Sequence, residues 1–146
     1  MAQQTALETL IELAQRDTDD CAKRLGVALK AVEEADQKLT MLLGYRDDYA
    51  MRLEAAQVAG ITPMAYRNFV AFMGKLDIAI NGQRDVIKHA RFKADHEKTA
   101  WQASERKRLS YRTLHERAAT EALKAENKRD QKQMDEHAAR QAYHKR

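Results

Sequence analysis

The chain has 146 residues, of which 44% are hydrophobic and 33% charged but only 6% aromatic, with five Gly and one Pro. This usage is typical of long helices, because a compact globular core of this length would recruit more aromatic and β-branched residues. The single Cys21 excludes an internal disulfide and a thiolate metal cluster, and no apolar run approaches the ~18 residues of a membrane span. We therefore expect one all-α domain over residues 1–146, cytoplasmic and without a signal peptide.

Charge is distributed unevenly between the two parts of the chain. Residues 1–60 carry 7 basic and 11 acidic side chains, net −4, and residues 61–146 carry 19 and 11, net +8. The basic part alternates in sign and lacks interleaved aromatic residues, so it resembles a solvated helix face more than a nucleic-acid surface. We expect the two parts to attract each other and expect no nucleic-acid partner.

A first helix is predicted over about residues 5–58. Alternating steps of four and three residues give a seam, the line of positions by which one helix faces another: Leu7, Ile11, Ala14, Thr18, Cys21, Leu25, Ala28, Val32, Ala35, Leu39, Leu42, Arg46, Tyr49, Leu53 and Ala56. Only Thr18 and Arg46 interrupt its apolar character. A period of 3.5 sustained over about seven heptads predicts a left-handed coiled coil. Thr5 followed by Glu8 is a capping-box pattern, which predicts that the helix begins at Thr5.

Residues 59–62 are predicted to form a tight turn. Gly60 suits the left-handed position after a helix, Thr62 suits the N-cap of the next helix, and Pro63 suits its first position. So short a connection requires an antiparallel hairpin.

A second, longer helix is predicted over about residues 63–142. Its apolar positions keep a similar spacing, with gaps at Gln83, Ala90 and Glu97: Tyr66, Phe69, Met73, Leu76, Ile80, Ile87, Ala94 and Trp101. Folding about residue 61 places Leu7 opposite about residue 115. The C-terminal ~25 residues then overhang without a partner helix.

The sequence offers little for catalysis. The five histidines are scattered along the second helix without metal-ligand pairing, and phosphate-binding loops and nucleophile elbows are missing from the sequence. A two-helix hairpin also lacks a concave pocket that could exclude water. We expect no enzymatic activity, no catalytic residues, no metal and no cofactor.

Near the turn, apolar residues exceed what a two-stranded seam can bury. A stripe beside the seam of the second helix lies opposite a similar stripe of the first, and together they could form one exposed patch: Leu42, Tyr45, Tyr49, Phe72, Leu76 and Ala79. Such a patch indicates a partner surface, with self-association or packing at the turn as the alternative.

The overhanging helix presents a second candidate surface. Four of its apolar positions fall on one face, Leu114, Ala118, Ala122 and Ala125, and Met134 follows farther along the helix. An unpartnered apolar stripe can dock into a groove, and a solvated, fraying single helix is the alternative.

Three stretches together resemble one family, the flagellar export proteins called FliJ. They are the opening Met1-Ala2-Gln3 with Ala6-Leu7 and Leu10, the segment from Met41 to Tyr49, and the series from Ala125 to Glu136. Heptad spacing alone does not require the Ala-Glu-Asn, Asp-Gln-Lys and Met-Asp-Glu series in the last stretch.

The resemblance implies a stalk of the flagellar type III export apparatus, peripherally associated with the inner membrane but not inserted in it. It implies three partners: the hexameric export ATPase, the linker of the FlhA export gate, and export chaperones. The family's gate-binding face maps onto the patch near the turn, and the overhanging helix supplies the candidate ATPase-binding residues. Lys38 and Gln83 depart from the family's glutamine and histidine beside that face. Three alternatives remain open: a virulence injectisome stalk, a general coiled-coil scaffold, and a basic helix hairpin that binds RNA or DNA.

Overall fold

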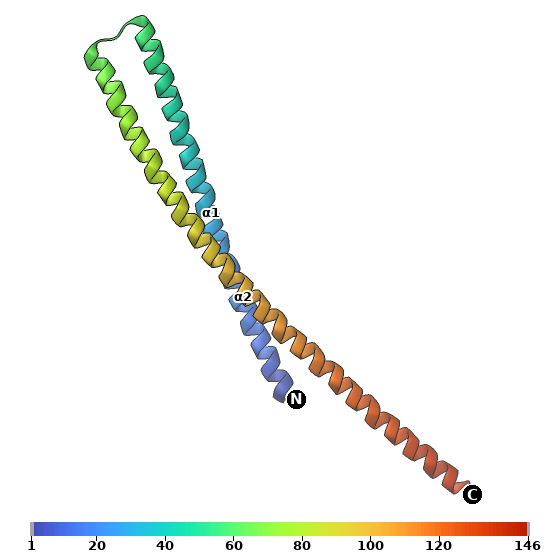
Figure 1. Cartoon of the computed structure of the whole chain (residues 1–146). Helices are drawn as coiled ribbons and strands as arrows, with labels where there is room; N and C mark the ends of the chain where they lie inside the picture. The colour runs from blue at the N-terminus through green and yellow to red at the C-terminus, as the bar shows by residue number, and fades with distance from the viewer. Residues whose placement is uncertain (1, 146) are drawn as a thin grey trace. The chain divides into compact units, whose positions relative to one another are not determined.

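A computed structural model describes residues 2–145, which form two helices, α1 (Ala2–Ala59) and α2 (Pro63–His144). Around the turn they run side by side in opposite directions (Figure 1). The predicted antiparallel hairpin with a longer second helix is confirmed. Two compact units can be described: the hairpin unit, Asp20–Trp101, and the terminal unit, which combines Met1–Asp19 with Gln102–Arg146.

The predicted seam of α1 is confirmed at each of its positions. Every seam residue from Leu7 to Ala56 is buried or half-buried, whereas most positions between them are exposed. Small side chains are the most deeply buried, and Ala14, Ala28 and Ala35 lie at the contact between the helices. Small residues at the seam let the partner helix approach closely, so larger side chains from α2 can fill the shared core.

In the hairpin unit, α2 supplies these larger side chains. Leu76, Ile80 and Ile87 are buried and form most of the aliphatic core. Gln83, a gap in the apolar pattern, is also buried, and its amide Nε2 donates a hydrogen bond of 2.9 Å to the carbonyl oxygen of Ala35. The bond satisfies a polar group that would otherwise be costly to bury. Gln83 is therefore a core residue, not part of an outer binding face.

The turn has the predicted geometry. Gly60 has a φ of 92°, a left-handed conformation that favours glycine. The Thr62 hydroxyl accepts a hydrogen bond of 3.1 Å from the backbone N–H of Ala65, which caps the start of α2, and Pro63 is the first helical residue.

The predicted start of α1 is wrong. The helix begins at Ala2, so Thr5 lies inside it and cannot be its N-cap. The carbonyl oxygen of Thr5 instead accepts a hydrogen bond of 3.0 Å from the hydroxyl of Thr9. Ala and Gln are good helix formers, and neither Gly nor Pro precedes Thr5 to end the helix there.

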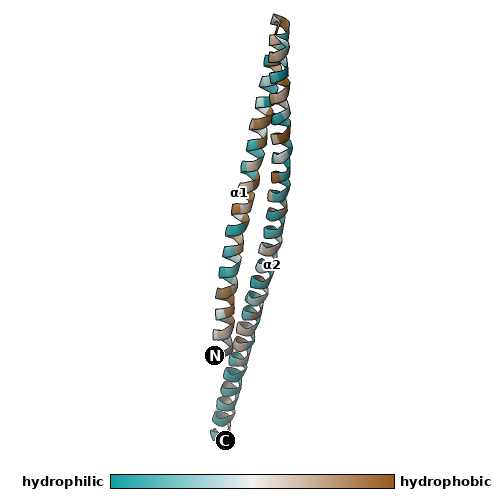
Figure 2. Ribbon diagram, turned by 90° about the vertical axis from the view of Figure 1, so that its left-hand side faces the viewer, coloured by the Kyte–Doolittle hydropathy of each residue, from teal (hydrophilic) through white to brown (hydrophobic). Residues whose placement is uncertain are grey.

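In the terminal unit the predicted pairing register is confirmed. His115 Nε2 lies 3.7 Å from Glu8 Oε1, which places the start of α1 beside the part of α2 expected from folding about residue 61. Beyond Ala118 every described residue of α2 is exposed. Brown, hydrophobic segments recur along α1, whereas the last part of α2 is largely hydrophilic (Figure 2). The predicted overhang is therefore present.

Candidate functional site

A shallow groove opens on one side of the hairpin unit, and we call it the tip groove. Six residues line it: Tyr45, Asp48, Tyr49, Arg52, Phe72 and Leu76. Four of them belong to the patch that the sequence predicted. The groove thus brings together residues from both helices that lie on either side of the turn.

An aromatic cluster builds one wall of the tip groove. The Tyr49 ring lies 4.4 Å from that of Phe72 and 5.1 Å from that of Phe69, measured between centroids, with tilted planes. Such tilted pairs add stability beyond their buried area. Tyr49 is half-buried by these contacts, while Tyr45 and Phe72 keep 54% and 43% of their surface exposed. Two large aromatic faces therefore remain available to a partner.

The remaining predicted patch residues differ in position. Leu42 is half-buried in the seam, and Ala79 is exposed. Leu76 was expected to point outward, and this expectation is wrong because only 9% of its surface is exposed. Leu76 is one of the α2 seam positions, so its side chain fills the core and presents only an edge to the floor of the groove.

Asp48 and Arg52 line the tip groove but were not predicted. Together with Tyr45 they follow the helical spacing i, i+3 and i+7, so all three fall on one face of α1. The signal was present in the sequence, but a search confined to apolar residues could not detect charged members of the face. These two residues give an otherwise aromatic groove a polar edge.

A second groove lies on the other side of the hairpin unit and shares no lining residue with the first. It is polar, and we call it the polar groove. The residues that line it are Leu43, Arg46, Asp47, Asp77, Ile80, Asn81 and Arg84. Arg46 Nε donates a hydrogen bond of 2.5 Å to Asp77 Oδ1 across the two helices. This bond and the nearby charge raise the pKa of Arg46. Arg46, which interrupts the apolar seam of α1, is thus paired with a carboxylate of α2.

The candidate ATPase-binding residues lie in the terminal unit. Leu114 and Met134 are 49% and 67% exposed, Ala122 and Ala125 are exposed, and Ala118 is half-buried. Their surfaces are therefore accessible within this unit, as docking would require.

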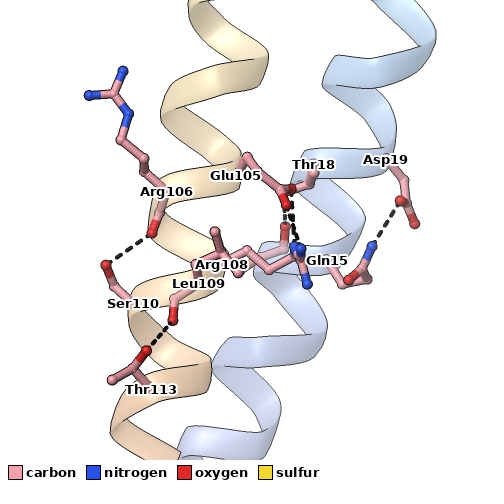
Figure 3. A network of polar contacts seen from close by, with 10 residues as sticks. Gln15, Thr18, Asp19, Glu105, Arg106, Arg108, Leu109, Ser110 and Thr113 are labelled. Atoms are coloured by element: carbon pink, nitrogen blue, oxygen red, sulfur yellow. Dashed lines mark hydrogen bonds and ion pairs between the residues drawn. The ribbon is translucent and has the colours of Figure 1, made fainter.

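On the α2 side, the seam of the terminal unit is more polar than that of the hairpin unit. Glu105 and Arg108 of α2 face Thr18 and Gln15 of α1 (Figure 3). Arg108 donates two hydrogen bonds to the Glu105 carboxylate, of 2.5 and 3.1 Å. These bonds lower the pKa of Glu105 and raise that of Arg108. Both side chains are only partly exposed. Arg108, seven residues after Trp101, occupies a position that a heptad normally fills with an apolar residue, and Glu105 lies beside that seam.

Residues 2–145 contain neither a candidate metal site nor a helix that could cross a membrane. In this part of the chain no group of three or more His, Cys, Asp or Glu side chains is arranged to hold a metal ion. Neither helix contains a stretch long and apolar enough to cross a membrane.

Comparisons with known proteins give a consistent result. The profile of the family described as "Flagellar FliJ protein" matches residues 3–146. The flagellar FliJ protein of Escherichia coli K12 is 36% identical over 145 residues, and that of Salmonella typhi 35%, each match covering 99% of both chains. Among solved structures, a putative YscO homolog from Chlamydia trachomatis superposes with a TM-score of 0.53 at 15% identity, covering 93% of this chain and 88% of that one. At this identity the last match shows a shared fold only.

Proposed function

Because the chain belongs to the flagellar FliJ family of type III export accessory proteins, we propose that it links two parts of that apparatus. The tip groove binds the linker of the FlhA export gate. The exposed part of α2 engages the hexameric export ATPase, and export chaperones are further partners. In this proposal the chain acts by binding alone.

The tip groove is the observation that carries the gate contact. Tyr45 and Phe72 expose large aromatic faces beside Leu76 in a single concave surface. Exposed aromatic residues around a concavity are typical of the few residues that dominate binding energy at protein interfaces. The same residues match the gate-binding face that the family resemblance implies.

The ATPase contact depends on a different unit of the chain. Residues 119–145 are exposed along their whole length and are helical to His144. An isolated helix gains little from its own hydrogen bonds in water, so a surface that packs against it would stabilise it as well as bind it. The stripe from Leu114 to Ala125 offers apolar contacts for such packing.

Paired pull-downs test whether the two contacts are separable. Tyr45→Ala with Phe72→Ala removes exposed rings and leaves Leu76 in the core, so helicity should stay near that of the wild type. We expect this variant to bind the FlhA linker at least ~2 kcal/mol more weakly and the ATPase normally. Truncation after Ala118 should weaken binding to the ATPase and leave binding to the FlhA linker normal. The truncated chain should still fold as a hairpin, because every seam residue stays in place.

Circular dichroism is the folding control for both variants. Loss of both partners by the double alanine variant, at unchanged helicity, would contradict the two-site proposal. Retention of ATPase binding by the truncated chain would remove α2 beyond Ala118 from the candidate ATPase site.

A further inference from the structure

The two sides of the hairpin unit differ in the residues that flank the seam. On the polar groove side, ion pairs bridge the helices: Arg46 with Asp77, and, two heptads farther along α2, Asp36 with Arg91 at 3.5 Å. On the tip groove side, the corresponding flanking positions of α2 after Phe72 are Ala79 and Val86, at steps of seven residues. One side is bridged by charge, whereas on the other the flanking positions of α2 from Phe72 to Val86 are apolar.

These three α2 residues define what we call the groove-side strip: Phe72, Ala79 and Val86. All three are exposed, Val86 at 51%. The strip ends at the next heptad with Lys93, and beyond it Arg24 forms an ion pair with Glu97 at 3.5 Å. From Phe72 to Val86 it extends about 21 Å at the helical rise, close to four turns of helix.

Flanking positions of a two-stranded coiled coil normally carry charged residues that pair across the seam. Apolar residues at these positions instead provide packing for a third helix, which lies in the groove between the first two. The tip groove and the strip are therefore parts of one linear surface. Its length suits a helical partner better than a single inserted side chain.

Charge defines the partner further. Lys38, Arg52 and Lys93 border this surface, and among residues 2–145 none of them forms an ion pair. Asp48 is the acidic residue that lines the tip groove. The edges therefore carry an excess of positive charge, which would attract a partner with acidic residues beside its apolar stripe.

We propose that the tip groove and the groove-side strip together bind an amphipathic helix of about four turns with acidic flanks, so that the hairpin unit and its partner form a three-helix bundle. This inference rests on the proposed gate contact and specifies the conformation of the bound FlhA linker. Val86 determines the length of the segment that fits, and Arg52 determines its charge.

The test is titration of a synthetic FlhA linker peptide with the full chain, followed by fluorescence anisotropy and by far-ultraviolet circular dichroism. Val86→Asp should weaken binding by about tenfold, and Val86→Asn, which removes the apolar contact without adding charge, by somewhat less. The matched control is Leu43→Asp, at an exposed flanking position on the polar groove side, which should change affinity less than about twofold. Arg52→Glu should weaken binding several-fold and flatten its dependence on salt. The peptide should gain helicity on binding.

The outcomes separate this inference from the function on which it rests. If Tyr45→Ala weakens binding but neither Val86 variant does, the gate contact stands and the three-helix arrangement is wrong. A bound peptide without added helicity overturns the arrangement too, and tighter binding by Arg52→Glu overturns the acidic partner. If neither Tyr45→Ala nor the Val86 variants affect binding, the proposed gate contact itself fails.

Discussion

The hairpin unit and the terminal unit share one heptad period but place different chemistry on it. In the hairpin unit the α2 side of the seam is Leu76, Ile80 and Ile87, which are buried. In the terminal unit the same side carries Glu105 and Arg108, which pair with each other. The heptad period determines which face of a helix is buried. The residues on that face determine how strongly the two helices pack against each other. The hairpin unit thus has the more apolar core, and the terminal unit leaves more of α2 exposed.

The largest expected effect comes from a charge placed in the seam of the hairpin unit. Ile80→Asp buries a carboxylate without a partner at a position that is 4% exposed and should lower the free energy of unfolding by about 3–5 kcal/mol. Urea unfolding followed by circular dichroism measures the change. The matched control is Ile78→Asp, the same substitution two residues away on a side chain that is 74% exposed. Similar losses from both variants would contradict the assigned seam.

Glycine substitutions test the same unit from its solvent face. A Cβ added at Gly26 or Gly74 would meet no atom within 4 Å, so Gly26→Ala and Gly74→Ala should each stabilise the chain by about 1 kcal/mol through helix propensity. Gly60→Ala, in contrast, should destabilise it by about 1 kcal/mol, because a φ of 92° strains any residue with a Cβ. Thermal unfolding of the three variants gives the comparison. If the unfolding temperature of all three variants shifts in the same direction, the left-handed conformation of Gly60 does not limit stability.

The sequence predicted the fold well where local periodicity decides it. Every seam position of α1, the Gly60 conformation and the Thr62 cap could be predicted because each depends on neighbouring residues. The start of α1 was wrong because capping patterns such as Thr5 with Glu8 also occur inside helices that have no reason to end there. Leu76 was placed on the patch as well as in the seam, and only three-dimensional packing shows which of two adjacent stripes is covered. Asp48 and Arg52 required knowledge of the concave surface that they border.

The polar pair of the terminal unit provides a smaller, opposite test. Glu105→Leu with Arg108→Leu replaces a partly exposed ion pair by apolar residues facing Thr18, and should modestly stabilise the contact between the two segments. Hydrogen exchange of the amides in residues 5–18 reports on this unit alone. Slower exchange there, with unchanged exchange in the hairpin unit, is the expected result. Faster exchange would show that the charged pair holds the segments together better than an apolar seam does.

The smallest expected effect is a dependence on pH confined to the terminal unit. The hydrogen bonds from Arg108 lower the pKa of Glu105 in the folded state, so folding favours the carboxylate form. The stabilisation is therefore fully present above the ordinary glutamate pKa, about 4.3, and is lost as the pH falls through the lower folded value. The effect should be small because the pair is partly solvated. Hydrogen exchange of residues 5–18 should accelerate, beyond the intrinsic pH dependence of exchange, in wild type between about pH 5 and pH 3, and Glu105→Gln should show no such step. An equal step in the Glu105→Gln variant would contradict the assignment of the acid sensitivity to Glu105.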